Sequence, residues 1–209
     1  HLPDQRGEVV SLEALTRTGP AVISFNRGHW CPYCKLELRA LSAIYGEIRQ
    51  SNARLVSIMP DNAQFTAEYQ KENALPFPVL SDIDLGFSLS LGLIFWIGEE
   101  IAQLYRGAGI DLAQYHGNPG KFLPMAAKFI VGQDGLVKAR QVNVEFRQRT
   151  RDILHSRYLR YANAGDDTRR AYRPRADSDL HGVSAAIGQC ACRIAGRNIA
   201  ANEIGRAHV

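Results

Sequence analysis

No apolar run in this 209-residue sequence approaches the roughly 18 residues that a membrane-spanning helix needs. We therefore expect no membrane anchor, and we expect a cytoplasmic protein. Compositional bias is also missing, because 45% of the residues are hydrophobic and 22% are charged, which are ordinary globular proportions. Cysteine is scarce, with 4 residues, and a chain of this length can fold without a disulfide framework. These features exclude collagen and a long coiled coil for the chain as a whole.

The C-terminal part of the sequence lacks Phe, Trp and Lys. Residues 161–209 also hold few large apolar side chains, so they can bury little surface. We predict one domain over residues 1–160 and an Arg/Ala-rich tail over residues 161–209 that is poorly ordered or weakly helical.

The excess of basic over acidic residues that gives the net charge of +4 lies in this C-terminal part of the chain. Residues 147–209 carry 12 Arg against 6 acidic residues, whereas residues 1–146 carry 13 Lys and Arg against 15 acidic residues. A basic tail without interleaved aromatic residues is typical of a solvated extension, so we expect no nucleic-acid partner.

The first 160 residues alternate between strand-like and helix-like patterns. Short β-branched runs predict buried strands, and apolar residues at helical spacing predict amphipathic helices between them. An Asp-Gly pair between two apolar runs predicts a hairpin. The fold class that follows is α/β, a three-layer sandwich with a central mixed sheet flanked by helices. The expected strands cover 21–26, 54–59, 77–81, 128–131 and 136–140, and the expected helices cover 31–49, a segment capped by Asp61, 82–91, 99–105 and a segment from about 147.

One motif carries chemistry, the Cys31-Pro-Tyr-Cys34 sequence between the first buried strand and the long helix. Two intervening residues bring both thiols to one side of the first helical turn, within disulfide reach. The dipole and unpaired N–H groups of a helix N-terminus stabilise a thiolate and lower its pKa. Such a thiolate suits both disulfide exchange and attack on peroxide. Because Cys34 begins the apolar stripe of the helix, we expect it to be buried and Cys31 to lie nearer solvent.

Two other interpretations of the motif stay open at this stage. Cys31 and Cys34 could form half of a zinc site with Cys190 and Cys192, or they could be structurally inert. The second pair is more than 150 residues away in a poorly apolar tail, so we favour redox chemistry and expect no metal. We expect Cys190 and Cys192 to be incidental, although a tail that folded back could supply a resolving thiol.

Residues around the motif have two possible roles each. His29 could stabilise a thiolate at Cys31 or stand beside the motif without a role, and Arg27 is equally ambiguous, with a solvated side chain favoured. We expect Trp30 to pack under the motif, and we expect His116 to be a loop residue.

At these residues the chain resembles the alkyl hydroperoxide reductase/thiol-specific antioxidant (AhpC/TSA) family, and in particular its peroxiredoxin-like branch with a thioredoxin-type CxxC motif. The resemblance extends from Leu2 to about Leu154 and covers roughly 150 of 209 residues. It implies a thioredoxin-like fold and thiol-based redox activity with Cys34 and Cys31 as the catalytic pair. The matching segments are Leu2-Pro-Asp-Gln-Arg-Gly, Phe25 to Cys34, Leu80-Ser-Asp, Ile110-Asp-Leu, Leu123 to Val131 and the Asp134-Gly135 turn.

The resemblance also implies two missing groups. Cys34 falls at the peroxidatic cysteine, but Cys31 stands where peroxiredoxins carry Thr or Ser, and Ala126 stands where they carry an active-site Arg. We predict reduction of hydrogen peroxide or organic hydroperoxides through a Cys31/Cys34 dithiol–disulfide cycle, without a cofactor. The implied reductant is thioredoxin or another dithiol, and a homodimer is an open expectation. Disulfide reduction by the same motif is the alternative, and a zinc-binding or redox-sensing module is the second.

Overall fold

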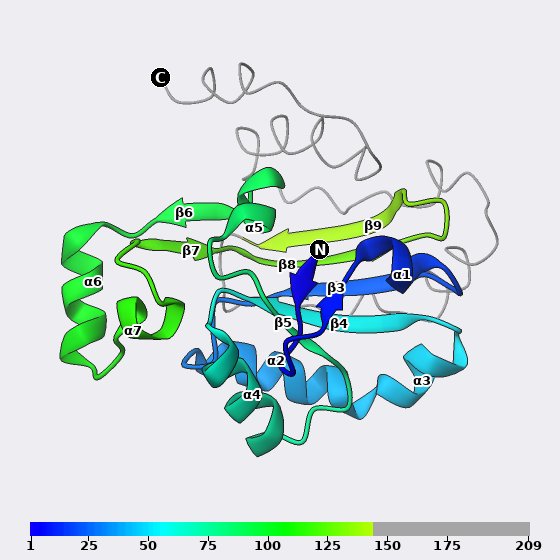
Figure 1. Cartoon of the computed structure of the whole chain (residues 1–209), viewed down its shortest axis with the longest axis horizontal. Coiled ribbons are helices and arrows are strands. Elements are labelled where there is room, and N and C mark those ends of the chain that lie inside the picture. Colours follow the sequence, from blue (N-terminus) through cyan, green and yellow to red (C-terminus); the bar gives the residue numbers. More distant parts are fainter. Residues whose placement is uncertain (144–209) are drawn as a thin grey trace, which may run out of the picture.

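The computed structural model describes residues 1–143, and its centre is a five-stranded mixed sheet. The strand order is β5-β4-β3-β8-β9 (Figure 1). Strands β3, β4 and β5 are parallel, whereas β8 runs antiparallel to β3 and β9 antiparallel to β8. The strand bounds are β3 Ala21–Phe25, β4 Arg54–Met59, β5 Val79–Ser81, β8 Ala126–Val131 and β9 Val137–Asn143.

Helices cover one face of the sheet and a second layer covers the other. The first face lies against α2 (Pro32–Ala43), α3 (Tyr45–Gln50) and α4 (Ala63–Glu72), and the second against α1 (Leu12–Thr16) and α5 (Gly86–Ser90). Successive strand residues alternate between the two cores, because side chains along a strand point to opposite faces. Val22 belongs to the α2 side, for example, and Ile23 to the other. The α/β three-layer prediction is therefore confirmed.

Small elements complete the described part of the chain. The N-terminal strands β1 (Leu2–Pro3) and β2 (Val9–Val10) pair with each other. A second two-stranded sheet joins β6 (Ile94–Trp96) to β7 (Phe122–Pro124), and the chain between these strands forms α6 (Gly98–Gly107) and α7 (Leu112–His116). This insertion lies at the end of the sheet where β3 leads into α2 (Figure 1).

The expected helix over 31–49 is divided in two. Helix α2 ends at Ala43, because Ile44 has φ −103° and ψ 7°, and α3 begins at Tyr45. The Ser42 hydroxyl donates to the Leu38 carbonyl, an arrangement that bends helices.

The predicted cap of α4 is also wrong. Asn62 caps this helix by accepting from the N–H groups of Gln64 and Phe65, whereas Asp61 is fully buried and faces another loop. The expected helix from about 147 and the predicted tail over 161–209 lie outside the described residues.

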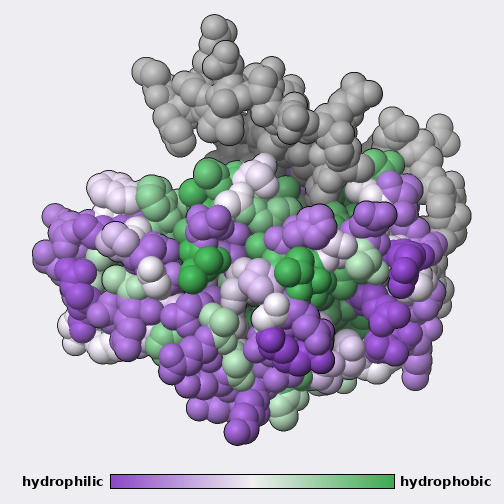
Figure 2. All heavy atoms as spheres, viewed as in Figure 1, coloured by the Kyte–Doolittle hydropathy of each residue, from purple (hydrophilic) through white to green (hydrophobic). Residues whose placement is uncertain are grey.

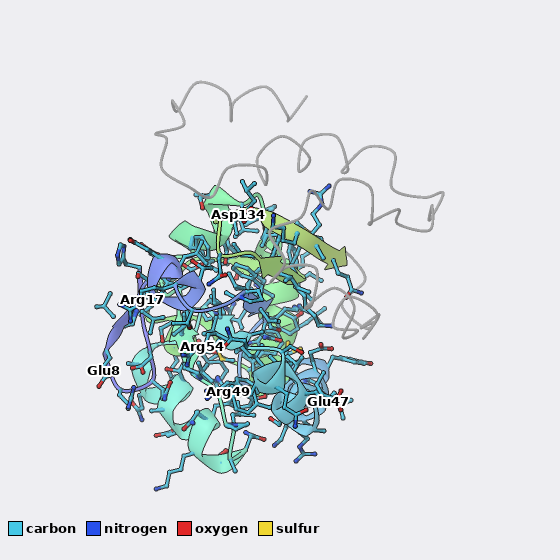
Figure 3. All side chains as sticks on the ribbon, turned by 90° about the vertical axis from the view of Figure 1, so that its right-hand side faces the viewer. Glu8, Arg17, Glu47, Arg49, Arg54 and Asp134 are labelled. Carbon is cyan, nitrogen blue, oxygen red and sulfur yellow. The ribbon has the colours of Figure 1, made fainter. Side chains whose placement is uncertain are left out.

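Two parts of the surface differ in polarity. Apolar residues gather over α5 and the β1–β2 pair, where Val9 and Leu89 are exposed (Figure 2). The end of the sheet at which β3 begins presents charged side chains instead (Figure 3). In the described part of the chain, no helix combines the length and the apolar character needed to cross a membrane.

Candidate active site

The candidate site is built on the segment of residues 26–31 that links β3 to α2, which we call the redox loop. Strand β3 is the middle strand, so its carboxyl end delivers this loop to the centre of the sheet edge. The Asn26 side-chain amide donates to the hydroxyls of Ser24 and Ser57, both at 3.1 Å, and its backbone N–H donates to the Ile58 carbonyl at 2.8 Å. These bonds tie the start of the loop to β3 and β4.

Gly28 allows the loop to turn sharply. Its φ of +140° is a conformation that residues with a Cβ rarely adopt. A Cβ on Gly28 would also lie 2.4 Å from Nε1 of Trp30 and 3.2 Å from Oδ1 of Asp61. The loop therefore requires glycine at this position for both conformational and steric reasons.

Both cysteines of the motif lie at the start of α2. Cys31 is the N-cap residue, Pro32 occupies the first turn, and Cys34 follows within that turn. The backbone N–H of Arg27 donates a hydrogen bond to Sγ of Cys34 at 3.3 Å. A sulfur atom that accepts such a bond near a helix N-terminus is stabilised in its thiolate form.

The expected exposure of Cys31 is wrong. Its exposed fraction is 1% and that of Cys34 is 0%, so both thiols are buried. The sequence places Cys31 at the tip of α2, but it does not reveal that other elements cover this tip. Tyr69 of α4 lies near enough for the charges of both thiolates to act on its hydroxyl.

His29 is fixed by Asp61 rather than left beside the motif. The backbone N–H of His29 donates to Oδ2 of Asp61 at 2.8 Å, and Nδ1 of the ring lies 3.0 Å from Oδ1. The ring stacks on Phe65 at 4.9 Å and contacts the edge of Tyr115 at 4.5 Å. Asp61 thus holds the redox loop to the start of α4.

Arg27 is buried, contrary to the expectation of a solvated side chain. Its exposed fraction is 4%, and Nη2 donates to the Tyr105 hydroxyl at 2.6 Å. The guanidinium lies 5.3 Å from the centroid of the Trp30 ring and 5.9 Å from that of Phe95. Trp30 is half-buried and packs on Tyr105 at 5.2 Å. The β6–α6 insertion therefore covers one side of the loop.

Sequence reasoning missed two buried polar residues near the loop. His116, expected in a loop, is the last residue of α7 and is 1% exposed. Burial lowers the pKa of His116, the charge of Asp61 acts in the opposite direction, and that of His29 lowers it further. Tyr69 is 4% exposed, and burial followed by the charges of Cys34 and Cys31 raises the pKa of its hydroxyl far above the usual range.

The structure also places the two positions at which the resemblance implies a missing Thr and a missing Arg. Cys31 is the N-cap of α2, and Ala126 begins β8 with 4% exposure. The nearest cation further along β8 is Lys128, whose Nζ lies 2.5 Å from Oε1 of Glu37, one helical turn beyond Cys34. Within residues 1–143, no three His, Cys, Asp or Glu side chains are grouped to hold a metal ion. Cys190 and Cys192 lie outside this part.

A family model described as the AhpC/TSA family matches residues 1–140. The chain belongs to the AhpC/TSA family. A protein of Helicobacter pylori named peroxiredoxin bcp is 25% identical to this AhpC/TSA chain over 155 residues, which is 74% of this chain and 90% of that protein. Peroxiredoxin Q, chloroplastic, from Oryza sativa subsp. japonica is 32% identical over 81 residues, which spans 39% of this chain and only 37% of the rice protein.

Solved structures agree with the family in fold. Peroxidoxin BcpB from Mycobacterium tuberculosis superposes with a TM-score of 0.59 at 21% identity, covering 79% of this chain and 92% of that one. A peroxiredoxin Q from Xanthomonas campestris gives 0.59 at 15% identity, covering 78% and 90%. These similarities confirm the thioredoxin-like fold of this AhpC/TSA chain.

Proposed function

We propose that this AhpC/TSA protein is a thiol peroxidase that reduces hydrogen peroxide or organic hydroperoxides. Cys34 attacks as the thiolate: an S–O bond forms, the O–O bond breaks, and the leaving oxygen takes a proton to become water or an alcohol. The Cys34 sulfenic acid then condenses with Cys31, which releases water and forms a disulfide. The observation that carries this proposal is the hydrogen bond from the Arg27 N–H to Sγ of Cys34.

Burial of the thiols supports a small substrate. Both sulfurs lie beneath the surface, with Cys31 1% and Cys34 0% exposed. A hydroperoxide is small enough to enter such a site, whereas the disulfide of a folded protein requires an exposed attacking thiol. Burial of Cys31 thus favours peroxide reduction over the alternative in which Cys31 attacks a protein disulfide.

The remaining steps need a reductant. We propose that thioredoxin or another dithiol reduces the Cys31–Cys34 disulfide after the redox loop opens around the oxidised pair, and that no cofactor takes part. A cytoplasmic location and a homodimer stay predictions from the sequence. The tail over 161–209 stays a proposed extension of the redox domain.

The test is the rate at which the fully reduced protein reacts with hydrogen peroxide and with an organic hydroperoxide. The variants are Cys34→Ser and Cys31→Ser, with sulfenic acid trapped and located by mass spectrometry. Because the tail also carries thiols, the control replaces Cys190 and Cys192 with Ser. We expect a rate far above that of an ordinary thiolate, loss of that rate only in Cys34→Ser, and sulfenic acid on Cys34. A wild-type rate equal to that of an ordinary thiolate would refute peroxidase activity.

A further inference from the structure

The hydroxyl of Tyr69 is buried without a hydrogen-bond partner among the described residues. Tyr69 belongs to α4 and is 4% exposed, and its ring packs in the core cluster between the sheet and α2. Its hydroxyl oxygen has no partner there. Buried polar groups are almost always hydrogen-bonded in folded proteins, so this exception requires an explanation.

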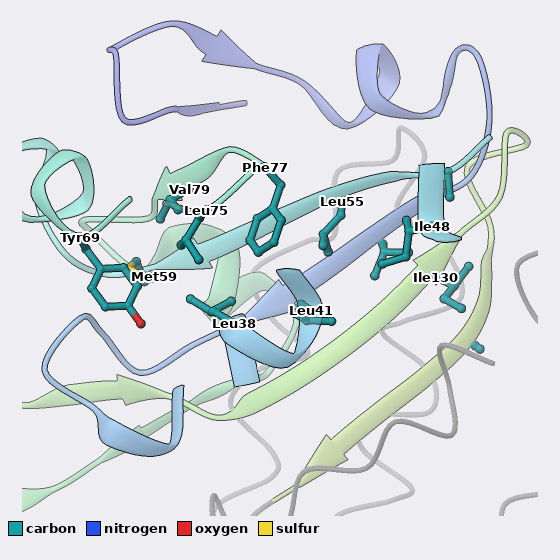
Figure 4. Packing of buried hydrophobic residues seen from close by; sticks show 13 residues of the cluster. Leu38, Leu41, Ile48, Leu55, Met59, Tyr69, Leu75, Phe77, Val79 and Ile130 are labelled. Atoms are coloured by element: carbon teal, nitrogen blue, oxygen red, sulfur yellow. The ribbon is translucent and has the colours of Figure 1, made fainter. Parts of the chain in front are cut away.

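Tyr69 stands at the redox loop. Its ring centroid lies 6.5 Å from that of His29 in an edge-on contact. Its hydroxyl points out of the core cluster toward the chain that follows β3 (Figure 4). The charges of Cys34 and Cys31 both act on this hydroxyl and, after burial, help to raise its pKa. The group therefore stays protonated at neutral pH and can only donate its hydrogen to an anion that forms beside it.

Other hydroxyls near the loop are already engaged. Tyr105 accepts from Arg27, and Tyr115 donates to the Gly109 carbonyl. The Thr66 hydroxyl donates to carbonyls of its own helix. The Trp30 indole N–H is a second donor without a partner, but it lies against the position where Gly28 would carry a Cβ. Among the hydroxyls of the described residues, that of Tyr69 is the one buried without any partner.

We propose that the Tyr69 hydroxyl binds the hydroperoxide at Cys34 and donates a hydrogen bond to its leaving oxygen. This inference rests on the proposed peroxidase function. Sulfur supplies the electron pair, the S–O bond forms as the O–O bond breaks, and the developing negative charge on the leaving oxygen is stabilised by the phenol. The leaving oxygen then takes its proton from water, and Tyr69 keeps its own. The hydroxyl thereby supplies, from α4, a donor that Cys31 and Ala126 cannot provide.

The decisive variant is Tyr69→Phe, which keeps the ring and removes only the hydroxyl. We expect the second-order rate with hydrogen peroxide to fall about 100- to 1,000-fold, the range seen when one donor to a developing oxyanion is removed. The rate with iodoacetamide, which has no peroxide oxygen to bind, should change less than about threefold, because the Arg27 N–H still stabilises the thiolate. The matched control is Tyr45→Phe, which alters a tyrosine packed against the same cluster and in contact with Phe77. It should leave both rates unchanged.

Three outcomes contradict the inference, and they are distinguishable. If wild type reacts rapidly with peroxide and Tyr69→Phe reacts at the same rate, the hydroxyl has no role in the reaction, while the peroxidase function is supported. An equal fall in the peroxide and iodoacetamide rates would place its effect on the thiolate instead of the substrate. A slow wild type would refute the peroxidase function and this inference with it. The melting temperature verifies folding, and we expect Tyr69→Phe to be at least as stable as wild type because the substitution removes an unsatisfied buried group.

Discussion

Asp61 holds His29 through two atoms at once, since Oδ2 accepts the backbone N–H at 2.8 Å and Oδ1 lies 3.0 Å from the ring Nδ1. The carboxylate is fully buried, and the residue follows β4, whereas His29 follows β3. The pair therefore joins the ends of two neighbouring parallel strands. It fixes the position of the redox loop relative to the start of α4.

Replacing this carboxylate should loosen the loop. In Asp61→Asn the amide oxygen still accepts the backbone N–H of His29, but the amide NH₂ now faces Nδ1, so the ring can no longer donate to a carboxylate there and the bond to a charged group is lost. We expect a loss of about 1–3 kcal/mol in the free energy of unfolding, measured by urea denaturation, and a slower reaction with peroxide. Asp84→Asn, at an exposed position near α5, is the control and should change neither quantity. Unchanged stability in Asp61→Asn would contradict the anchoring role.

Gly28→Ala should damage the same loop by steric conflict. The new Cβ would lie 2.4 Å from Nε1 of Trp30, at a φ of +140°. We expect destabilisation by about 2 kcal/mol or more, in the range of strained backbone positions, together with slower alkylation of the thiols. Gly46→Ala is the opposite case, because Gly46 lies in α3 with nothing within 4 Å of the added Cβ. That substitution should stabilise the protein by up to about 1 kcal/mol. Thermal unfolding of both variants gives the comparison.

The Glu37–Lys128 ion pair joins α2 to β8 inside the protein. The side chains are 7% and 5% exposed, so removing one partner leaves a buried charge without its counter-ion. We expect Glu37→Gln to cost about 3 kcal/mol in unfolding free energy. The double variant Glu37→Gln with Lys128→Met should cost less than that single change. The exposed pair of Arg106 with Glu99 offers the control, since both side chains are 50% exposed and Arg106→Gln should cost less than about 1 kcal/mol. A double variant less stable than Glu37→Gln would contradict this account.

His116 should make stability depend on pH. Burial holds the pKa of His116 below the ordinary value of 6.5 in the folded protein. Below about pH 6.5 the unfolded chain therefore binds a proton that the folded protein does not, so stability falls as the pH falls, by at most about 1.4 kcal/mol per pH unit from this group. Unfolding free energies between pH 7.5 and pH 5 should show a shallower decline in His116→Asn than in wild type. An identical pH profile in the two proteins would exclude His116 as the cause.

Deletion of residues 161–209 tests the proposed domain boundary. The described sheet, both core clusters and the redox loop lie within residues 1–143. We expect the shortened protein to keep its melting temperature and its rate with hydrogen peroxide. The deletion also removes Cys190 and Cys192. A large loss in either quantity would show that the tail belongs to the working domain.

Much of the fold was predictable because it depends on local patterns. The runs that became β3 and β4 are short, apolar and β-branched, and the Asp134-Gly135 turn lies between β8 and β9. The short pairs β1–β2 and β6–β7 were missed, because strands of two or three residues carry no readable period. The division at Ile44 was missed for a related reason, since the apolar spacing continues across the break.

Some features of the candidate site were likewise predictable from the sequence, and others were not. The sequence by itself determined that two thiols stand at the start of a helix after a buried strand, because chain order and residue spacing are local properties. Only the tertiary structure decided that Cys31 is buried, that Arg27 is covered by Tyr105, and that Asp61 anchors the loop instead of capping α4. It also brought Tyr69, 35 residues beyond Cys34, to the thiols. These features depend on which distant elements cover the loop. The spacing of residues within one element does not predict which other element packs against it.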